Sequence, residues 1–223
     1  MPAAEQNDWV LWQLADSAFP TGGFAHSGGV EAAFQYEEVR NTETLFAFIE
    51  AALHQAGHGA LPFVSAAFNQ VEPFRQIDSY CDAFTSNHVA NRASRLQGRA
   101  FLNSANRAFD SEPLQKLRGE LNEMPCHFAP VFGAVARVLQ INQLVALRLF
   151  LFTQLRGWVS SAVRLGIIGP LEAQHIQHQL GPLAEQTVES CRGLSLDDAA
   201  QTASLIDLFQ GGQDRLYSRL FQS

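Results

Sequence analysis

Two pairs of histidines have types and spacings that suit metal chemistry. His54 and His58 are four residues apart, and His175 and His178 are three residues apart. Both spacings place two imidazoles on one face of a helix, where they can bind Zn²⁺ or Ni²⁺. Neither pair has a third ligand beside it in the sequence, so the simpler interpretation is a pair of surface or helix-end histidines.

The adjacent Cys126 and His127 combine a thiol with an imidazole, which suits either a nickel site or a nucleophile with its base. Adjacent residues on a regular element point apart, however, and a working pair usually meets through the fold. The sequence contains no G-x-S-x-G elbow and no H-E-x-x-H motif. We therefore expect no catalytic residue and no tightly bound cofactor. The alternative is a nickel- or zinc-dependent enzyme, or a nickel-binding protein, that uses these histidine and cysteine pairs.

A glycine cluster, Gly22-Gly23-Phe-Ala-His-Ser-Gly28-Gly29, has the spacing of a phosphate-binding loop. A Walker A loop needs a lysine and then a Ser or Thr after its last glycine, whereas Gly29 and Val30 follow Gly28 here. The cluster instead predicts a tight turn between two helices, where glycine permits a positive φ or close packing.

Arg92, Arg95 and Arg99 recur at i, i+3 and i+7, so they share one face of a helix. One interpretation is a solvated stripe whose charges pair with Asp78 or Asp82 on a neighbouring helix. The other is a surface that meets an acidic partner.

The last residues of the sequence are unusually apolar. Leu216 to Phe221 supply a Tyr, an Arg, two Leu and a Phe, which is the residue mix of an interface anchor, whereas chain ends are commonly polar and loose. This segment either docks back on its own domain or becomes ordered on a partner.

The elements that must position these residues read as helices. Of the 223 residues, 47% are hydrophobic, and no stretch shows the alternation of a strand. We expect an all-α fold, a single compact helical domain of about ten helices spanning residues 1–223, in which Ile141 to Leu165 is a central buried helix. The expected helices are 8–17, 28–39 capped by Ser27, 42–57, 62–71, 74–86, 88–109, 112–122, 130–140, 141–165, 170–191, and 195–209, the last of them ended by Gly211-Gly212.

Composition excludes some classes of protein. A net charge of −7 argues against a nucleic-acid binder that works through a basic surface. The most apolar run, Leu144 to Leu155, is too short to span a bilayer, and the first residues lack the features of a signal peptide. Three cysteines without a C-x-x-C pair fit a reducing compartment. We expect a cytoplasmic protein that binds neither nucleic acid nor membrane.

Five sequence elements, taken in order, resemble the urease accessory protein UreF family. They are the N-terminal WQL with FPTGGFAHS and Glu31, then NRASRLQG (91–98), HFAPVFG (127–133), RLGIIGP (164–170) and the closing YSRLFQS (217–223). The sequence departs from the family where His26 replaces a common Tyr and where Gln213-Asp214 replace a common His-Glu pair. Gly28 and Val30 also replace a bulkier polar residue and a Leu.

The resemblance implies an all-α, dimeric protein that is not itself an enzyme. It implies binding to UreD (also called UreH) and recruitment of the GTPase UreG. Ni²⁺ would then pass transiently through the assembled complex to apo-urease, and GTP hydrolysis could be modulated there. The 19–31 turn and the 211–223 tail are the expected docking surfaces. The residues expected to contact partners are Phe19, Pro20, Thr21, Gly22, Gly23, Phe24, His26, Ser27, Glu31, Arg95, Tyr217, Arg219, Leu220 and Phe221.

Overall fold

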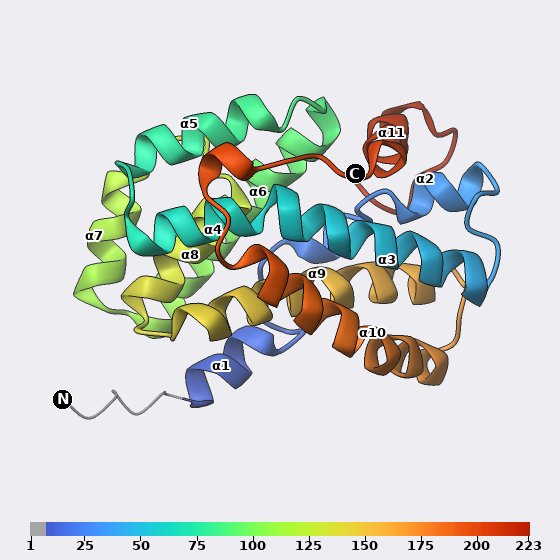
Figure 1. The fold of residues 1–223 in the computed structure, drawn as a ribbon, viewed down its shortest axis with the longest axis horizontal. Coiled ribbons are helices and arrows are strands. Elements are labelled where there is room, and N and C mark those ends of the chain that lie inside the picture. Colours follow the sequence, from blue (N-terminus) through green and yellow to red (C-terminus); the bar gives the residue numbers. More distant parts are fainter. Residues whose placement is uncertain (1–7) are drawn as a thin grey trace.

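The regular secondary structure of residues 8–223, the part of the chain that the computed structural model describes, consists of α-helices and short 3-10 turns joined by loops (Figure 1). The described residues contain no strand, which confirms the all-α, single-domain prediction; residues 1–7 of the predicted domain lie outside them. The α-helices are α1 (Asp8–Ala15), α2 (Val30–Gln35), α3 (Thr42–Gly59), α4 (Leu61–Asn69), α5 (Phe74–Phe84), α6 (His88–Phe109), α7 (Glu112–Glu120), α8 (Phe128–Val138), α9 (Gln143–Arg164), α10 (Pro170–Cys191) and α11 (Ser204–Gly212). The 3-10 turns are η1 (Gly23–Ala25), η2 (Leu196–Asp198) and η3 (Gln213–Arg215).

Polar caps set where several helices begin. The Asn41 side chain accepts a hydrogen bond of 3.0 Å from the Thr44 N–H, and the Thr44 hydroxyl accepts one of 3.1 Å from the Asn41 N–H. This reciprocal pair satisfies two N–H groups that would otherwise lack partners at the start of α3. Asn87 and Asn142 cap α6 and α9 through one side-chain oxygen each, which accepts hydrogen bonds from two main-chain N–H groups of the first turn.

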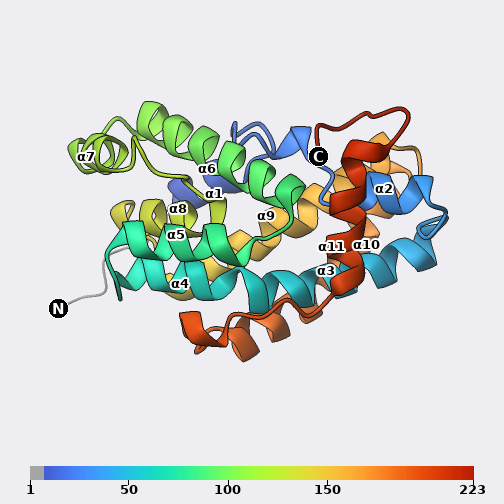
Figure 2. The ribbon, with the colours of Figure 1, turned by 90° about the horizontal axis from the view of Figure 1, so that it is seen from above.

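Helix α9 runs through the middle of the molecule, as the sequence predicts for a helix that is apolar nearly all round (Figures 1 and 2). Its first half packs into a hydrophobic cluster with α4, α6 and α8, where Leu147 and Leu151 are fully buried. Its second half packs with α3 and α10 in another cluster, around Leu155 and Ala162. Because α9 joins both clusters, it carries the residues at its C-terminal end on a rigid support.

The predicted second helix is wrong at both ends. We expected residues 28–39 with Ser27 as the cap, whereas α2 begins at Val30 and ends at Gln35. Gly28 and Gly29 have φ of 63° and 95°, left-handed values that cannot continue a helix. The Ser27 N–H is also taken by a distant residue, because it donates to the Ser223 carbonyl.

The predicted final helix is also wrong. Ser195 caps only the short turn η2, and α11 begins nine residues later and includes Gly211 and Gly212. A side chain of α3 explains the break: the Gln55 Oε1 accepts hydrogen bonds from the N–H groups of Thr202 (2.5 Å) and Ala203 (2.8 Å). Those groups are thereby held outside a helix.

None of the helices within residues 8–223 combines the length and the apolar character that crossing a membrane would require.

Candidate functional site

The end of the sequence docks back on its own domain, which is the first of the two arrangements that the sequence allowed. The Gln222 N–H donates to the Ala25 carbonyl (2.8 Å), and the Ser27 N–H donates to the Ser223 carbonyl (2.5 Å). The His26 Nδ1 and the Ser223 hydroxyl are also hydrogen-bonded. We call residues 213–223 the tail and residues 19–31 the turn segment; the end of the tail lies beside this segment in the structure (Figure 2).

A buried carboxylate at the start of α2 fixes the tail. Glu31 is 1% exposed, and its oxygens accept hydrogen bonds from the N–H groups of Leu220 (2.6 Å) and Phe221 (3.1 Å). The Gln213 side-chain amide donates a third, of 2.5 Å. A buried carboxylate with three donors is well satisfied, and removing it would leave buried N–H groups without an acceptor.

Arg164, the last residue of α9, lies between two aromatic rings. Its guanidinium carbon is 3.7 Å from the ring centre of Phe24 and 4.1 Å from that of Phe221, and the guanidinium donates to the Phe24 carbonyl. Burial lowers the pKa of Arg164, and the nearby Glu31 acts in the opposite direction. Cation–π contacts on both sides link the turn segment to the tail.

The sequence prediction missed Arg164. It lies in the RLGIIGP element that supports the family resemblance, but that resemblance assigned it no role. The available signal was an arginine at the end of a largely apolar helix, directly before a break.

His26 is buried against the tail at 8% exposure. Burial, together with the positive charge of Arg92, lowers the pKa of His26 to about 4. The imidazole is therefore neutral near pH 7, and its Nδ1 can form the hydrogen bond to Ser223 without carrying a charge into the interior.

The glycines of the turn segment act as the sequence predicts for a tight turn. Gly22, Gly28 and Gly29 all have positive φ. A Cβ atom on Gly28 would lie 2.5 Å from the Trp158 Nε1 atom of α9, which is closer than real contacts allow. Only glycine fits at this position, both for its backbone conformation and for its packing.

Asp214 connects the tail to the arginine stripe of α6. Its carboxylate lies 2.9 Å from the Arg92 guanidinium, 3.3 Å from the His88 imidazole and 3.2 Å from the Arg219 guanidinium. The hydrogen bond from Arg92 is the main reason that the pKa of Asp214 is lowered. Arg219, which we expected to contact a partner, thus has a carboxylate partner within its own chain.

The expected pairing of the stripe with Asp78 or Asp82 is therefore wrong for Arg92. Asp78 is buried and accepts hydrogen bonds of 2.8 Å from the N–H groups of Cys126 and His127. Asp82 is 2.9 Å from the His127 Nε2 and also accepts from the Asn91 side chain.

The structure divides the remaining predicted site residues into exposed and hidden ones. Phe24, Tyr217 and Leu220 are exposed by 74%, 105% and 53%, and Arg219 is exposed as well. His26, Ser27, Glu31 and Phe221 are buried behind them, so they support the surface rather than form it.

Four predicted residues lie apart from these contacts or only shape the turn. Phe19 is buried and packs against the rings of Phe101 and Phe109 in the core. The Pro20 carbonyl accepts from the Ser104 hydroxyl, and the Thr21 hydroxyl accepts from the Gly23 N–H. Arg95 lies on α6, in a separate hollow.

The histidine and cysteine pairs do not assemble into a larger cluster. Within residues 8–223, no group of three His, Cys, Asp or Glu side chains is placed to hold a metal ion. The side chains of Cys126 and His127 serve different partners: the thiol donates to the Leu121 carbonyl, while the imidazole bonds to Asp82 and Ser94.

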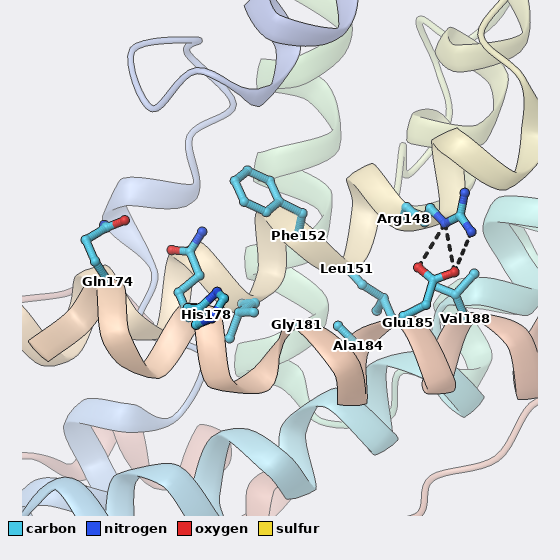
Figure 3. A pocket seen from close by; sticks show the side chains of 11 residues that line it. Arg148, Leu151, Phe152, Gln174, His178, Gly181, Ala184, Glu185 and Val188 are labelled. Atoms are coloured by element: carbon cyan, nitrogen blue, oxygen red, sulfur yellow. Dashed lines mark hydrogen bonds and ion pairs between the residues drawn. The ribbon is translucent and has the colours of Figure 1, made fainter.

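A groove of about 420 Å³ lies between α9 and α10 (Figure 3). Its floor includes Leu151 and Phe152, and the Arg148–Glu185 ion pair closes one end. His178 contributes a single imidazole, beside glutamine side chains.

Known proteins resemble this chain over nearly its full length. The UreF family model matches residues 39–181. Urease accessory protein F of Oryza sativa subsp. japonica is 37% identical over 219 residues, covering 96% of this chain and 84% of the rice protein. Urease accessory protein F of Arabidopsis thaliana is 36% identical over 221 residues, covering 96% and 92%. Urease accessory protein UreF of Bradyrhizobium diazoefficiens is 27% identical over 212 residues, covering 92% and 87%.

The helical fold, the turn segment with its docked tail, and the similarity to these proteins all indicate the same family. The chain belongs to the UreF family of urease accessory proteins.

Proposed function

We propose that this protein is a non-catalytic scaffold for urease maturation in the cytoplasm. In this proposal it forms a homodimer, binds UreD (also called UreH) and recruits the GTPase UreG, so that nickel is inserted into apo-urease. The observation that carries the proposal is the surface formed jointly by the turn segment and the tail. There Phe24 of the turn segment and Tyr217 and Leu220 of the tail expose apolar side chains, and Arg219 of the tail is exposed as well.

The construction of this surface supports a docking role. Aromatic residues and arginine are the side chains that contribute most to protein interfaces. Phe24 is held by Arg164, and the main chain beside Leu220 is held by Glu31. A partner would therefore meet groups that are already ordered, which lowers the entropic cost of binding.

Nickel and GTP enter the proposal only through the assembled complex. The protein would hold no resident cofactor, and Ni²⁺ would pass through the complex transiently. By ordering the switch segments of UreG, the scaffold would modulate GTP hydrolysis.

The test compares two triple variants of the full chain. Phe24→Ala/Tyr217→Ala/Leu220→Ala removes the exposed apolar side chains of the surface. Leu171→Ala/Leu205→Ala/Leu208→Ala removes three equally exposed apolar side chains elsewhere. Each variant is mixed with UreD and UreG, and assembly is followed by size-exclusion chromatography and by activation of apo-urease.

We expect the first variant to lose the ternary complex and urease activation while it keeps its helicity, and the second to behave as the wild type. Full assembly and full activation with the first variant would refute the proposed surface. GTP turnover measured in the complex, with and without this protein, tests the modulation separately.

A further inference from the structure

A hollow of about 600 Å³ on the outer face of α6 has an unusual charge. Arg92, Arg95 and Arg99 all line it, together with His88 near the start of the helix. The protein as a whole has a net charge of −7. Three guanidinium groups within one hollow are therefore a local reversal of the overall charge, and they attract anions.

The carboxylates near these arginines leave Arg95 and Arg99 in excess. Asp214 is bound by Arg92, His88 and Arg219. Asp82 also lines the hollow, but its carboxylate is already hydrogen-bonded to the side chains of His127 and Asn91.

Within residues 8–223, neither Arg95 nor Arg99 forms an ion pair at 4.0 Å or less; Arg99 donates to the Met124 carbonyl, at 3.3 Å, and also interacts with the Cys126 thiol. Arg95 and Asp82 feel each other electrostatically without a direct bond. Most of the N–H donors of the Arg95 and Arg99 guanidinium groups are therefore available to a ligand.

We propose that this hollow binds an acidic segment of a protein partner, with side-chain carboxylates on Arg95 and Arg99. The inference rests on the proposed scaffold function, and it names the chemistry of the partner at a second part of the docking surface. The Arg92–Asp214–Arg219 contacts make the hollow continuous with the tail.

The arrangement favours a peptide over a phosphate group. Arg95 and Arg99 are one helical turn apart, about 6 Å along the axis, which fits two separate carboxylates on one chain. Leu96 is 48% exposed between them and offers an apolar contact to the stems of acidic side chains.

A phosphate would lack its usual main-chain partners here. The N–H groups of Val89 and Ala90 at the start of α6 already donate to the Asn87 side chain. The ionised Asp82 in the hollow also repels a doubly charged phosphate more strongly than a single carboxylate.

The experiment uses the full chain and a fluorescein-labelled hexaglutamate peptide, with binding followed by fluorescence anisotropy at low salt. The variant Arg95→Glu/Arg99→Glu reverses the two free charges. The matched control, Arg107→Glu/Arg118→Glu, makes the same change of charge at two exposed arginines outside the hollow. Hexaglutamine serves as the neutral peptide, and circular dichroism checks that each variant is folded.

We expect hexaglutamate to bind the wild type and the control, to bind Arg95→Glu/Arg99→Glu at least about tenfold more weakly, and to be weakened by salt. Hexaglutamine should not bind. Equal hexaglutamate affinity for the two double variants would overturn the inference. Displacement of the peptide by inorganic phosphate, beyond that caused by chloride at equal ionic strength, would also overturn it by indicating a phosphate site.

The same variants separate this inference from the proposed function. If Arg95→Glu/Arg99→Glu keeps full affinity for hexaglutamate and assembles normally with UreD and UreG while the Phe24/Tyr217/Leu220 variant does not assemble, only the acidic-partner inference fails. If hexaglutamate binding depends on Arg95 and Arg99 while neither variant affects assembly, the hollow stands as an acid-binding site and the scaffold assignment of the surface fails.

Discussion

Glu31 Oε1 and the main-chain N–H of Leu220 are joined by a hydrogen bond of 2.6 Å, although 189 positions separate the two residues. The first turn of α2 thereby fixes the end of the tail. Because the Glu31 side chain is 1% exposed, water cannot readily replace the tail as a hydrogen-bond donor.

Glu31→Gln should loosen the tail without unfolding the domain. The substituted amide keeps one acceptor oxygen, but its NH₂ group then faces main-chain donors, which costs about 2 kcal/mol. Hydrogen exchange at the Leu220 and Phe221 amides should become faster. Glu43→Gln, at an exposed position of α3, is the control and should leave those amides protected. Unchanged protection in Glu31→Gln would show that the carboxylate does not hold the tail.

His26 should make the folded state less stable in acid. Its pKa is lowered to about 4 in the folded protein, against an ordinary value of 6.5 for a histidine in water. Below pH 6.5 the unfolded chain binds a proton that the folded protein does not accept until about pH 4, so the free energy of unfolding falls across this window.

The measurement is the urea midpoint between pH 7 and pH 4, followed by circular dichroism. Carboxylates also titrate near pH 4, so the informative quantity is the difference between the wild type and His26→Asn, which should lose part of the slope. His175→Asn, at an exposed histidine, should keep the slope of the wild type. A slope that survives intact in His26→Asn would contradict the assignment.

Arg164→Lys should weaken tail docking although it preserves the positive charge. An ammonium group cannot stack as a flat plane between the Phe24 and Phe221 rings, so about 1–2 kcal/mol should be lost. Faster exchange at the Gln222 amide, which bonds to the turn segment, is the readout. Arg107→Lys should have no effect, and equal behaviour of the two variants would count against the stacked arrangement.

Two glycine-to-alanine substitutions should change the free energy of unfolding in opposite directions. Gly28→Ala meets both a φ of 63° and the Trp158 ring, and should destabilise the protein by about 2 kcal/mol or more. Gly157→Ala, within α9, meets nothing within 4 Å and should stabilise it by about 0.5–1 kcal/mol. Thermal unfolding of both variants checks the pair, and a stabilised Gly28→Ala would show that the turn can adjust.

The helices could be predicted from sequence wherever local signals decide the structure. The bounds of α6 and α10 agree with the prediction, since Asn87 caps the first and Gly169-Pro170 begins the second. The prediction failed after Ser195 because the Gln55 side chain, from a helix far earlier in the chain, holds residues 202 and 203. No local pattern reports such a contact.

The candidate site could also be predicted only in part from the sequence. The resemblance indicated the turn segment and the tail, yet it could not tell which side chains are exposed. Phe221 has the character of a partner anchor but is buried against its own domain. The roles of Arg164 and Asp214 were not predicted because they come from contacts with residues that are distant in sequence.

The joint construction of the turn segment and tail has a consequence for protein synthesis. Ribosomes produce Phe24 long before Leu220, so the composite surface can form only after the last of these residues has emerged. A chain clipped by a protease between Gly212 and Leu220 would keep every residue of α1 to α11 but lack part of this composite surface. Under the proposed function, such a molecule would lack the side chains that we expect a partner to contact.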